Sequence, residues 1–419
     1  MNTLEAGFVK TDITPETNRQ TIYHRSGQLD DDKTPVRDRL FARATAFRSA
    51  SEVGVWVTAD LLCVDTRLRD AVTARLAKEG IPPGHVALCA THTHTAPTIV
   101  PFHSVEPTPE DYLVFLESKL AEVVLEAVRS ARPAQIAFGK TTVDLSVNRR
   151  EIGRMSEIND MNTPTGLVDK TVRVARISML EGGGQAVLLN YAAHPISMSK
   201  NCPLISADYP GKAVEFLESR GFAFAQFFQG CAGNANMKIH GDEREAGAIG
   251  RGLGQAVIEA VEWARPSSSC ELRMVTERVR LPWGKMATEA EARSFPRKDR
   301  RAQDWAEAVL RAYTQNQVRP YSEVLIQAMR LGDAVFVALP GEVFLEIGLA
   351  IRRAAGIENL FVVAYSNNDE IGYIPTRAAF LEGGYEVDSA PYYYGLFQLS
   401  PDCESITVDA AVRAARSVS

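Results

Sequence analysis

The chain has 419 residues and a net charge of −6, from 46 lysine and arginine against 52 aspartate and glutamate residues. This acidic balance argues against a nucleic-acid-binding protein, which normally carries a basic excess. Because no apolar run approaches the roughly 20 residues that cross a bilayer, we also expect no membrane insertion.

The cysteines and the N-terminus indicate a compartment. Six cysteines are scattered along the chain without the Cys-x-x-Cys spacing of redox or structural metal sites. The first residues, Met1 to Glu5, lack the charged and apolar regions of a signal peptide. We therefore expect a cytoplasmic protein with reduced thiols.

Apolar, β-branched runs alternate along the chain with helical spacing of apolar residues. The runs predict strands, covered on both faces, at residues 53–57, 85–89, 186–190, 224–228, 334–339 and 360–364. The helical spacing predicts helices at residues 68–76, 112–128, 213–217, 246–263, 343–351 and 406–417. We expect an α/β fold with a mixed β-sheet core flanked by helices, in a single domain over residues 1–419.

Residues 284–320 depart from this alternation. The segment is dense in charge around Arg297–Arg301 and then helical, so we expect a charged helical excursion on the surface. Its basic residues favour a solvated helix face, and a basic patch for an acidic partner is the alternative.

Two histidines follow the second predicted strand. In extended backbone, side chains two residues apart point to the same side, so His92 and His94 are aimed together. Such a pair indicates a metal or proton-transfer site, and a polar loop with two exposed histidines is the alternative.

Further candidates follow other predicted strands. His194 comes after the third strand and Glu342 after the fifth. Ligands of open α/β sheets bind beyond the carboxyl ends of the strands, and two histidines with a carboxylate form a common catalytic zinc set. Two alternatives are a satisfied core histidine at His194 and a helix-capping role for Glu342.

Segments from residue 6 to about residue 400 together resemble the catalytic N-terminal domain of the neutral/alkaline non-lysosomal ceramidase family. The resemblance depends on an ordered set of motifs. They are residues 6–15, the Thr-His-Thr-His of 91–94, Val147–Arg149, His194 with Ser197-Met198, Ala207-Asp208, 230–237, Leu339–Phe344, Tyr373–Thr376 and Tyr385-Glu386.

The resemblance implies a ceramidase-like fold and one Zn²⁺ ion. Carried over position by position, the ligands are His92, His194, Glu342 and Tyr373. The Tyr373 ligand follows from the resemblance alone, because tyrosine is an uncommon zinc ligand. His94 is implied as an acid/base group or as a neighbour of the metal.

The resemblance also implies groups that bind the substrate. Arg149 and Tyr385 match positions that hold or polarise the substrate carbonyl. Asn236 stands where the family has a serine, so a role carried by that serine is in doubt here. We expect no C-terminal immunoglobulin-like domain, and a long-chain membrane lipid is not the substrate we expect.

The main functional hypothesis is a zinc-dependent hydrolase that cleaves an amide (C–N) bond of a small soluble substrate through a zinc-activated water. His94 would transfer the proton, Arg149 and Tyr385 would stabilise the oxyanion, and Asn236 could donate a hydrogen bond. The alternatives are a zinc lyase or isomerase on a sugar-like or hydroxy-acid substrate, an esterase or lactonase, and a non-catalytic binding protein. Tyr392–Tyr394 either line an aromatic pocket or pack the domain edge.

Overall fold

The structure, a computed structural model, describes residues 4–15, 36–97, 99, 109–150, 166–198, 204–394 and 397–419. Its largest element is a nine-stranded sheet with the strand order β4-β3-β2-β1-β5-β7-β8-β9, to which β11 adds alongside β5. The β3–β4 and β8–β9 pairs are parallel and the other pairs are antiparallel. The strands are β1 Glu5–Asp12, β2 Phe41–Arg48, β3 Val53–Ala59, β4 Val86–Ala90, β5 Arg132–Thr142, β7 Thr171–Met179, β8 Gln185–Tyr191, β9 Phe224–Gln229 and β11 Arg265–Pro266.

A second sheet of four strands has the order β12-β13-β14-β16, with a parallel β14–β16 pair. Its strands are β12 Leu272–Pro282, β13 Tyr321–Leu331, β14 Ala334–Ala338 and β16 Asn359–Val363. Two short pairs stand apart from both sheets, β6 Ser146–Asn148 with β10 Ala235–Met237 and β15 Glu342–Val343 with β17 Tyr373–Ile374.

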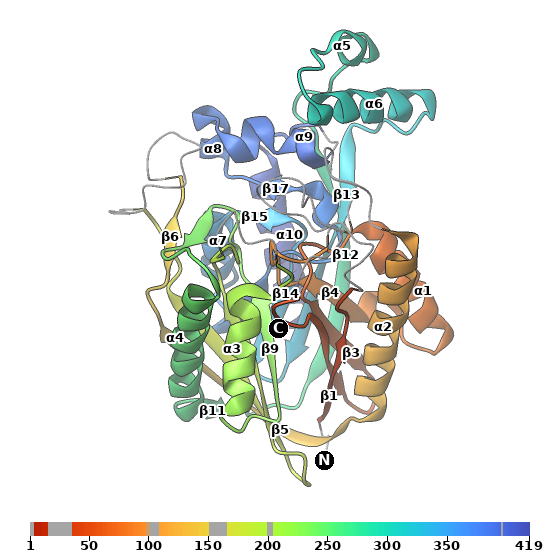
Figure 1. The fold of residues 1–419 in the computed structure, drawn as a ribbon. Helices are drawn as coiled ribbons and strands as arrows, with labels where there is room; N and C mark the ends of the chain where they lie inside the picture. The colour runs from red at the N-terminus through yellow and green to blue at the C-terminus, as the bar shows by residue number, and fades with distance from the viewer. Residues whose placement is uncertain are drawn as a thin grey trace.

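The two sheets pack face to face, and helices cover their outer faces (Figure 1). In the core between the sheets, the Trp56 ring of the first sheet lies 5.7 Å from the Phe336 ring of the second. Helix α2 packs on β1 and β2, α4 on β5 and β7, α3 on β9, and α10 on β12, β13 and β14. The main helices are α1 Thr66–Lys78, α2 Glu110–Arg129, α3 Asp208–Ser219, α4 Glu243–Glu262, α7 Leu345–Ala355 and α10 Cys403–Val418.

The remaining helices are short or lie in the segment between β12 and β13. They are α5 Glu289–Ser294, α6 Arg300–Thr314, α8 Arg377–Glu382 and α9 Pro391–Tyr394, with single turns η1 Pro83–His85, η2 Asp369–Ile371 and η3 Tyr385–Ser389. Helix starts follow local chemistry, since the Asp65 and Asp299 carboxylates accept from the backbone N–H of Leu68 and Ala302 and cap α1 and α6.

The predicted α/β architecture, with a mixed sheet and flanking helices, is confirmed. Each of the six predicted strands and six predicted helices overlaps an observed element of the same type. The structure adds the second sheet, which takes up the predicted strands at 334–339 and 360–364. Residues 343–351 form a helix only from Leu345, because Glu342 and Val343 pair with β17 instead.

At one end of the sandwich, backbone hydrogen bonds join the loops of the two sheets. The Ala90 N–H donates to the Tyr365 carbonyl over 2.9 Å, and the Ala364 N–H donates to the Gln229 carbonyl over 3.0 Å. Strands β4, β8, β14 and β16 end near this junction, so loops from distant parts of the chain meet there.

The structure bears on two features of the sequence, the absence of membrane-spanning runs and the scattered cysteines. None of the helices in the described ranges has the length and apolarity needed to cross a membrane. Five cysteines in those ranges are unpaired, namely Cys63, Cys89, Cys231, Cys270 and Cys403, whereas Cys202 lies outside the described residues.

Candidate metal centre and active site

Three histidine side chains converge where the loops of the two sheets meet. His92 and His94 follow β4, and His194 follows β8. The Nε2 atom of His92 lies 3.1 Å from Nε2 of His194 and 3.2 Å from Nε2 of His94. His92 and His194 are buried, and His94 is half-buried. All three rings therefore present the same nitrogen to one point.

Glu342, at the start of β15, completes the cluster from the second half of the chain. Its Oε2 atom lies 3.0 Å from Nε2 of His194 and 3.3 Å from Nε2 of His92. The side chain is 5% exposed, so the carboxylate is withdrawn from water. Because an isolated carboxylate is costly to bury, a compensating positive charge is required beside Glu342.

Backbone carbonyls fix the orientation of the two buried imidazoles. Nδ1 of His92 donates to the Leu62 carbonyl and Nδ1 of His194 donates to the Ala232 carbonyl, each over 2.6 Å. Because a carbonyl oxygen only accepts, each Nδ1 carries the hydrogen and each neutral ring has a bare lone pair on Nε2. Two such lone pairs, 3.1 Å apart, require a cation or an added proton between them.

The donor set fits a zinc ion. Bonds of about 2.0–2.1 Å to a tetrahedral ion place neighbouring donor atoms about 3.3 Å apart. The donor atoms of His92, His194 and Glu342 lie 3.0–3.3 Å from one another, and Nε2 of His94 lies 3.2 Å from Nε2 of His92. Imidazole nitrogens with one carboxylate are also the donor types that catalytic zinc sites use. The spacing of the donor atoms and their chemical types thus both fit a zinc ion.

The protonation of the cluster is shifted toward the form that binds a metal. Burial lowers the pKa of His194 to about 4, so this imidazole is neutral near pH 7. Burial alone would raise the pKa of Glu342, but His92 and His194 beside it hold that pKa well below its usual range. A neutral imidazole and an ionised carboxylate are the ligating forms of these groups.

The backbone at the cluster is strained. His92 has φ of 66° and Tyr365 has φ of 57°, in the left-handed region that residues other than glycine rarely adopt. The His92 N–H donates to the Leu61 carbonyl over 3.0 Å, and the Tyr365 ring lies 4.1 Å from the His92 ring. Strain of this kind persists where the surroundings impose it, most often at functional sites.

Two tyrosines lie next to Glu342. Tyr373 is its direct partner in the parallel β15–β17 pair, so the two side chains project to the same side. Tyr394, on α9, donates a hydrogen bond from its hydroxyl to Oε1 of Glu342. This bond leaves Oε2 as the carboxylate atom that faces the histidines.

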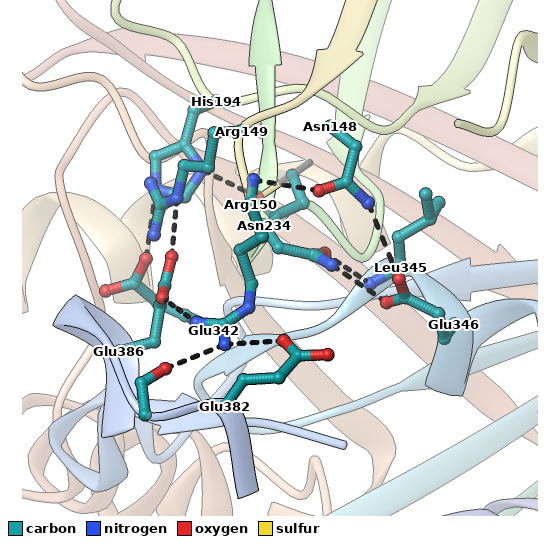
Figure 2. A network of polar contacts seen from close by, with 12 residues as sticks. Asn148, Arg149, Arg150, His194, Asn234, Glu342, Leu345, Glu346, Glu382 and Glu386 are labelled. Carbon is teal, nitrogen blue, oxygen red and sulfur yellow. Dashed lines mark hydrogen bonds and ion pairs between the residues drawn. The ribbon is translucent and has the colours of Figure 1, made fainter. Parts of the chain in front are cut away.

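A buried ion-pair network flanks the cluster (Figure 2). Glu386 accepts from Nε of Arg149 over 2.7 Å and from Nη1 of Arg150 over 2.6 Å. Arg150 also reaches Oε2 of Glu382 over 3.0 Å. Glu386 thus bridges two adjacent guanidinium groups, whose two charges it balances together with Glu382, and ties the end of β6 to η3.

The Arg149 guanidinium packs against two tyrosine rings. Its carbon Cζ lies 5.4 Å from the Tyr373 ring centroid and 5.8 Å from that of Tyr385. Burial would lower the pKa of Arg149, but Tyr373 and Glu386 raise it well above its usual value. Arg149 is therefore a permanent cation beside the cluster.

The start of α7 anchors the same region (Figure 2). Asn234 donates from Nδ2 to Oε2 of Glu346 over 2.8 Å and accepts from the Leu345 N–H over 2.9 Å. The Arg149 N–H in turn donates to the Asn234 carbonyl over 2.9 Å. These bonds fix the turn after β9 against the helix that follows Glu342.

Asn236 and Tyr365 carry buried polar atoms that have no hydrogen-bond partner in the part of the chain that the structure describes. Asn236 forms a β-bridge with His194 and is fully buried, yet neither Nδ2 nor Oδ1 has a hydrogen-bond partner among the described residues. The buried Tyr365 hydroxyl also has none among those residues. Buried polar atoms of this kind, beside a donor cluster, are available to bind water or a polar ligand.

The structure brings the sequence-predicted site residues into one region. His92, His194 and Glu342 share the donor cluster, with His94 at its half-buried side and Tyr373 alongside Glu342. The Tyr385 and Tyr373 rings are 5.7 Å apart. Arg149 packs on both rings, and Asn236 forms a bridge with His194.

Sequence reasoning missed three residues of the region. The sequence places Glu386 in a family motif, Tyr394 in a run of tyrosines and Tyr365 directly after a predicted strand, but it predicts no role in the site for any of the three. The three consecutive tyrosines Tyr392–Tyr394 are a sequence signal that could have indicated a role for Tyr394 in the site. No local signal distinguishes Glu386, because its partner Arg149 lies 237 residues away.

The chain was compared with known families and structures. The family model described as "Neutral/alkaline non-lysosomal ceramidase, N-terminal" matches residues 5–230, more than half of the chain.

Two solved structures have similar folds. The crystal structure of neutral ceramidase from Pseudomonas aeruginosa has a TM-score of 0.76 and 21% sequence identity, and the match covers 99% of this chain and 74% of the other. A ceramidase complexed with C2 has a TM-score of 0.79 and 19% identity, with 99% of this chain and 75% of the other covered. At this identity the structural similarity establishes the fold.

Proposed function

This chain belongs to the neutral/alkaline non-lysosomal ceramidase family and is therefore a hydrolase that acts on an amide bond; we propose that it uses one zinc ion and a small, soluble amide substrate. The observation that carries the proposal is the donor cluster, in which the Nε2 atoms of His92 and His194 face Oε2 of Glu342 and His94 lies beside His92.

His92, His194 and Glu342 would hold the ion, with Tyr373 as a fourth ligand that the family resemblance implies. Bound there, zinc supplies Lewis acidity, which polarises a carbonyl and acidifies water. The carbonyl contacts of His92 and His194 support this role, because they orient both rings toward the ion.

The neighbouring side chains supply the remaining steps. His94 is half-buried at the edge of the cluster, where it can carry a proton from the attacking water to the leaving amine. Arg149, which Glu386 holds in place, and Tyr385 stabilise the negative charge that develops on the carbonyl oxygen. Asn236, whose amide group has no hydrogen-bond partner among the described residues, lies next to His194, where the family has a serine.

The surroundings of the cluster favour a small polar substrate over a long acyl chain. An acyl chain needs a long apolar groove, whereas the described neighbours of the cluster are Arg149, Asn236 and the tyrosines. The five unpaired cysteines support a location in the reducing cytoplasm.

Hydrolysis in oxygen-18 water tests the reaction class. The zinc-loaded protein is incubated with a panel of short N-acyl amides, and the products are analysed by mass spectrometry. We expect one labelled oxygen in the carboxylate product, because water is the nucleophile. Turnover to an unlabelled product would support a lyase or isomerase instead, and failure to cleave any amide of the panel would reject the small soluble substrate.

A further inference from the structure

Three short extended segments lie side by side next to the candidate metal centre, and Asn236 is in the middle one. In the antiparallel β6–β10 pair it stands opposite Val147, and on its other edge it forms a parallel bridge with His194. The Arg149 N–H extends the β6–β10 ladder by donating to the Asn234 carbonyl over 2.9 Å. Because side chains alternate along extended segments, those of His194, Asn236 and Arg149 project to the same side.

The residues next to these three in the chain face the other way. Ala193 and Met237 belong to the hydrophobic core that α3 and α4 cover. The Asn148 side chain points to α7, where its Nδ2 lies 3.5 Å from Oε1 of Glu346 (Figure 2). The side chain of Asn236 is therefore directed to the side of the metal centre.

Both polar atoms of the Asn236 side chain are open. The residue is fully buried, and neither Oδ1 nor Nδ2 has a hydrogen-bond partner among the described residues. Nη2 of Arg149, on the same side, is also buried and has no acceptor in that part of the chain. Leaving a buried polar atom unpaired costs about 1–3 kcal/mol, a cost that a bound polar molecule removes.

The space in front of Asn236 is bordered on two sides. On one side is the donor cluster, where Nε2 of His194 lies 3.0 Å from Oε2 of Glu342. On the other side is the Arg149 guanidinium, which packs 5.4 Å from the ring centroid of Tyr373, the register partner of Glu342. A substrate whose carbonyl oxygen lies between the metal centre and Arg149 therefore has its amide bond beside Asn236.

The open atoms differ in what they can bind. Nη2 of Arg149 and Nδ2 of Asn236 are donors, and a carbonyl oxygen satisfies them. An amide oxygen such as Oδ1 only accepts, so its partner must be a donor on the bound molecule. Whichever way the amide plane is turned, one donor and one acceptor face the site. An amide substrate carries such a donor next to its carbonyl, the N–H of the bond that is cleaved, whereas an ester carries none.

We propose that Asn236 selects amides over esters, because its Oδ1 atom accepts a hydrogen bond from the N–H of the bond that is cleaved. The inference rests on the proposed amide hydrolysis and assigns its specificity to the position at which this chain departs from the family serine. The substrates are then primary and secondary amides. An ester or an N,N-dialkyl amide leaves Oδ1 buried and unpaired, and sites built to bind an N–H group discriminate strongly against analogues that lack it.

Matched amide and ester pairs test this role in the full-length, zinc-loaded protein. Each pair is a short N-acyl amide and the ester of the same skeleton, in which oxygen replaces the N–H group. The measured quantity is the ratio of kcat/KM for the amide to kcat/KM for the ester. Comparing this ratio between variants cancels the higher intrinsic reactivity of esters. We expect Asn236→Ala and Asn236→Leu to lower the ratio by about 10- to 100-fold, the effect of one buried hydrogen bond.

Asn236→Asp keeps an acceptor in the same place and loses the donor. It should lower kcat/KM for both substrates, because the donor serves the carbonyl oxygen of either, and it should keep the wild-type ratio. Asn148→Ala is the matched control, since it removes an amide that faces the opposite side of the same segments, and it should also keep the ratio.

Two kinetic results would overturn the role of Asn236 as acceptor and leave the proposed function intact. One is an unchanged ratio in Asn236→Ala, with kcat/KM either preserved or lowered equally for the amide and the ester. The other is a ratio that falls in Asn236→Asp as far as it does in Asn236→Ala.

Calorimetry with uncleaved analogues decides the point even if no amide is turned over, an outcome that would count against the proposed function alone. The pair is a phosphonamidate and the phosphonate ester of the same skeleton, which carry N–H and oxygen at the position of the leaving atom. Tighter binding of the phosphonamidate to the wild type by about 10-fold or more, and equal binding of the two analogues to Asn236→Ala, supports the assignment. The same difference in both proteins, or no difference in the wild type, would refute it.

Discussion

The imidazoles of His92 and His194 are oriented by the protein itself. A backbone carbonyl accepts from Nδ1 of each ring, so both Nε2 lone pairs face the same point without help from an ion. This arrangement lowers the cost of binding, because little ordering of the ligands is left to be done when the ion arrives. Metal affinity here thus depends on residues beyond the ligands themselves.

His94 differs from His92 in its exposure, and this difference separates their proposed roles. We predict that His94→Gln keeps one zinc ion per chain while kcat falls by about 100-fold or more, the usual range for loss of a general acid/base. Metal analysis and steady-state kinetics on the same preparation check this. Loss of zinc together with activity would make His94 a ligand and remove its proton-transfer role.

Tyr394 holds the carboxylate of Glu342 through its hydroxyl group. We predict that Tyr394→Phe weakens zinc binding by about 10-fold, because Oε1 loses its donor and the carboxylate is free to rotate. Competition with a chromophoric chelator measures the affinity. Tyr393→Phe, the next residue on α9, is the control and should bind zinc as the wild type does; equal weakening in both variants would point to damage to the helix.

Several strands deliver their functional residues at their carboxyl ends, where the two sheets meet. His92 follows β4, His194 follows β8 and Glu342 follows β14. Asp369, in η2, accepts from the Gly341 N–H over 3.1 Å and from the Val64 N–H over 2.7 Å. One buried carboxylate therefore fixes the loop of Glu342 against the loop whose Leu62 carbonyl orients His92.

Asp60, at the end of β3, gives this junction a pH dependence. It is fully buried and accepts from the Phe41 N–H and the Thr91 hydroxyl, and burial raises its pKa from 3.8 to about 6. The folded protein holds this proton more tightly than the unfolded chain, so the stabilisation is complete below about pH 4 and is lost as the pH rises through 6.

We predict that, between pH 4 and pH 7, the unfolding free energy of the metal-free wild type falls by up to about 3 kcal/mol relative to that of Asp60→Asn. Urea titrations of both proteins across this pH range, with a chelator present, provide the measurement. Parallel pH profiles for the two proteins would show that Asp60 titrates in the folded state as it does in the unfolded chain.

The sequence predicts strands that are largely apolar, and it misses strands with polar residues at buried positions, such as Arg43 and Thr45 in β2, or with exposed residues. Strands β4, β8, β9, β14 and β16 are largely apolar and buried, and the sequence predicts each of them. Strands such as β12 alternate irregularly between buried and exposed residues, which weakens the apolar signal. The second sheet was not predicted, because helices and a facing sheet cover a strand equally well.

The sequence predicts several site residues, but it does not predict the contacts that hold them in place. Ligand types at strand ends predict His92, His194 and Glu342, and a family resemblance adds Tyr373, Arg149, Tyr385 and Asn236. The Arg149–Glu386 pair and the Tyr394–Glu342 bond join positions 237 and 52 residues apart. Contacts of this kind depend on the packing of loops, which no local pattern encodes.

At the scale of the whole molecule, the candidate metal centre lies between the two sheets and contains residues from both. His92 and His194 come from loops of the first sheet, and Glu342 comes from a loop of the second. An ion bound there resists separation of the sheets, so metal binding and folding are coupled.

We therefore predict that zinc stabilises the chelator-treated protein by about 2.7 kcal/mol at a free concentration 100 times Kd, which raises Tm by a few degrees. Differential scanning calorimetry at several zinc concentrations measures the shift. A Tm that is independent of zinc would contradict binding at a joint between the sheets.

The most direct measurement of the central claim is the zinc content of the purified wild type and of His92→Ala and His194→Ala, determined by mass spectrometry together with amidase activity. The donor cluster predicts one zinc ion per wild-type chain, and the loss of zinc and activity together in both variants. His85→Ala, which removes a histidine far from the cluster, should retain both. Stoichiometric zinc in His92→Ala and His194→Ala would contradict the assignment of the metal centre.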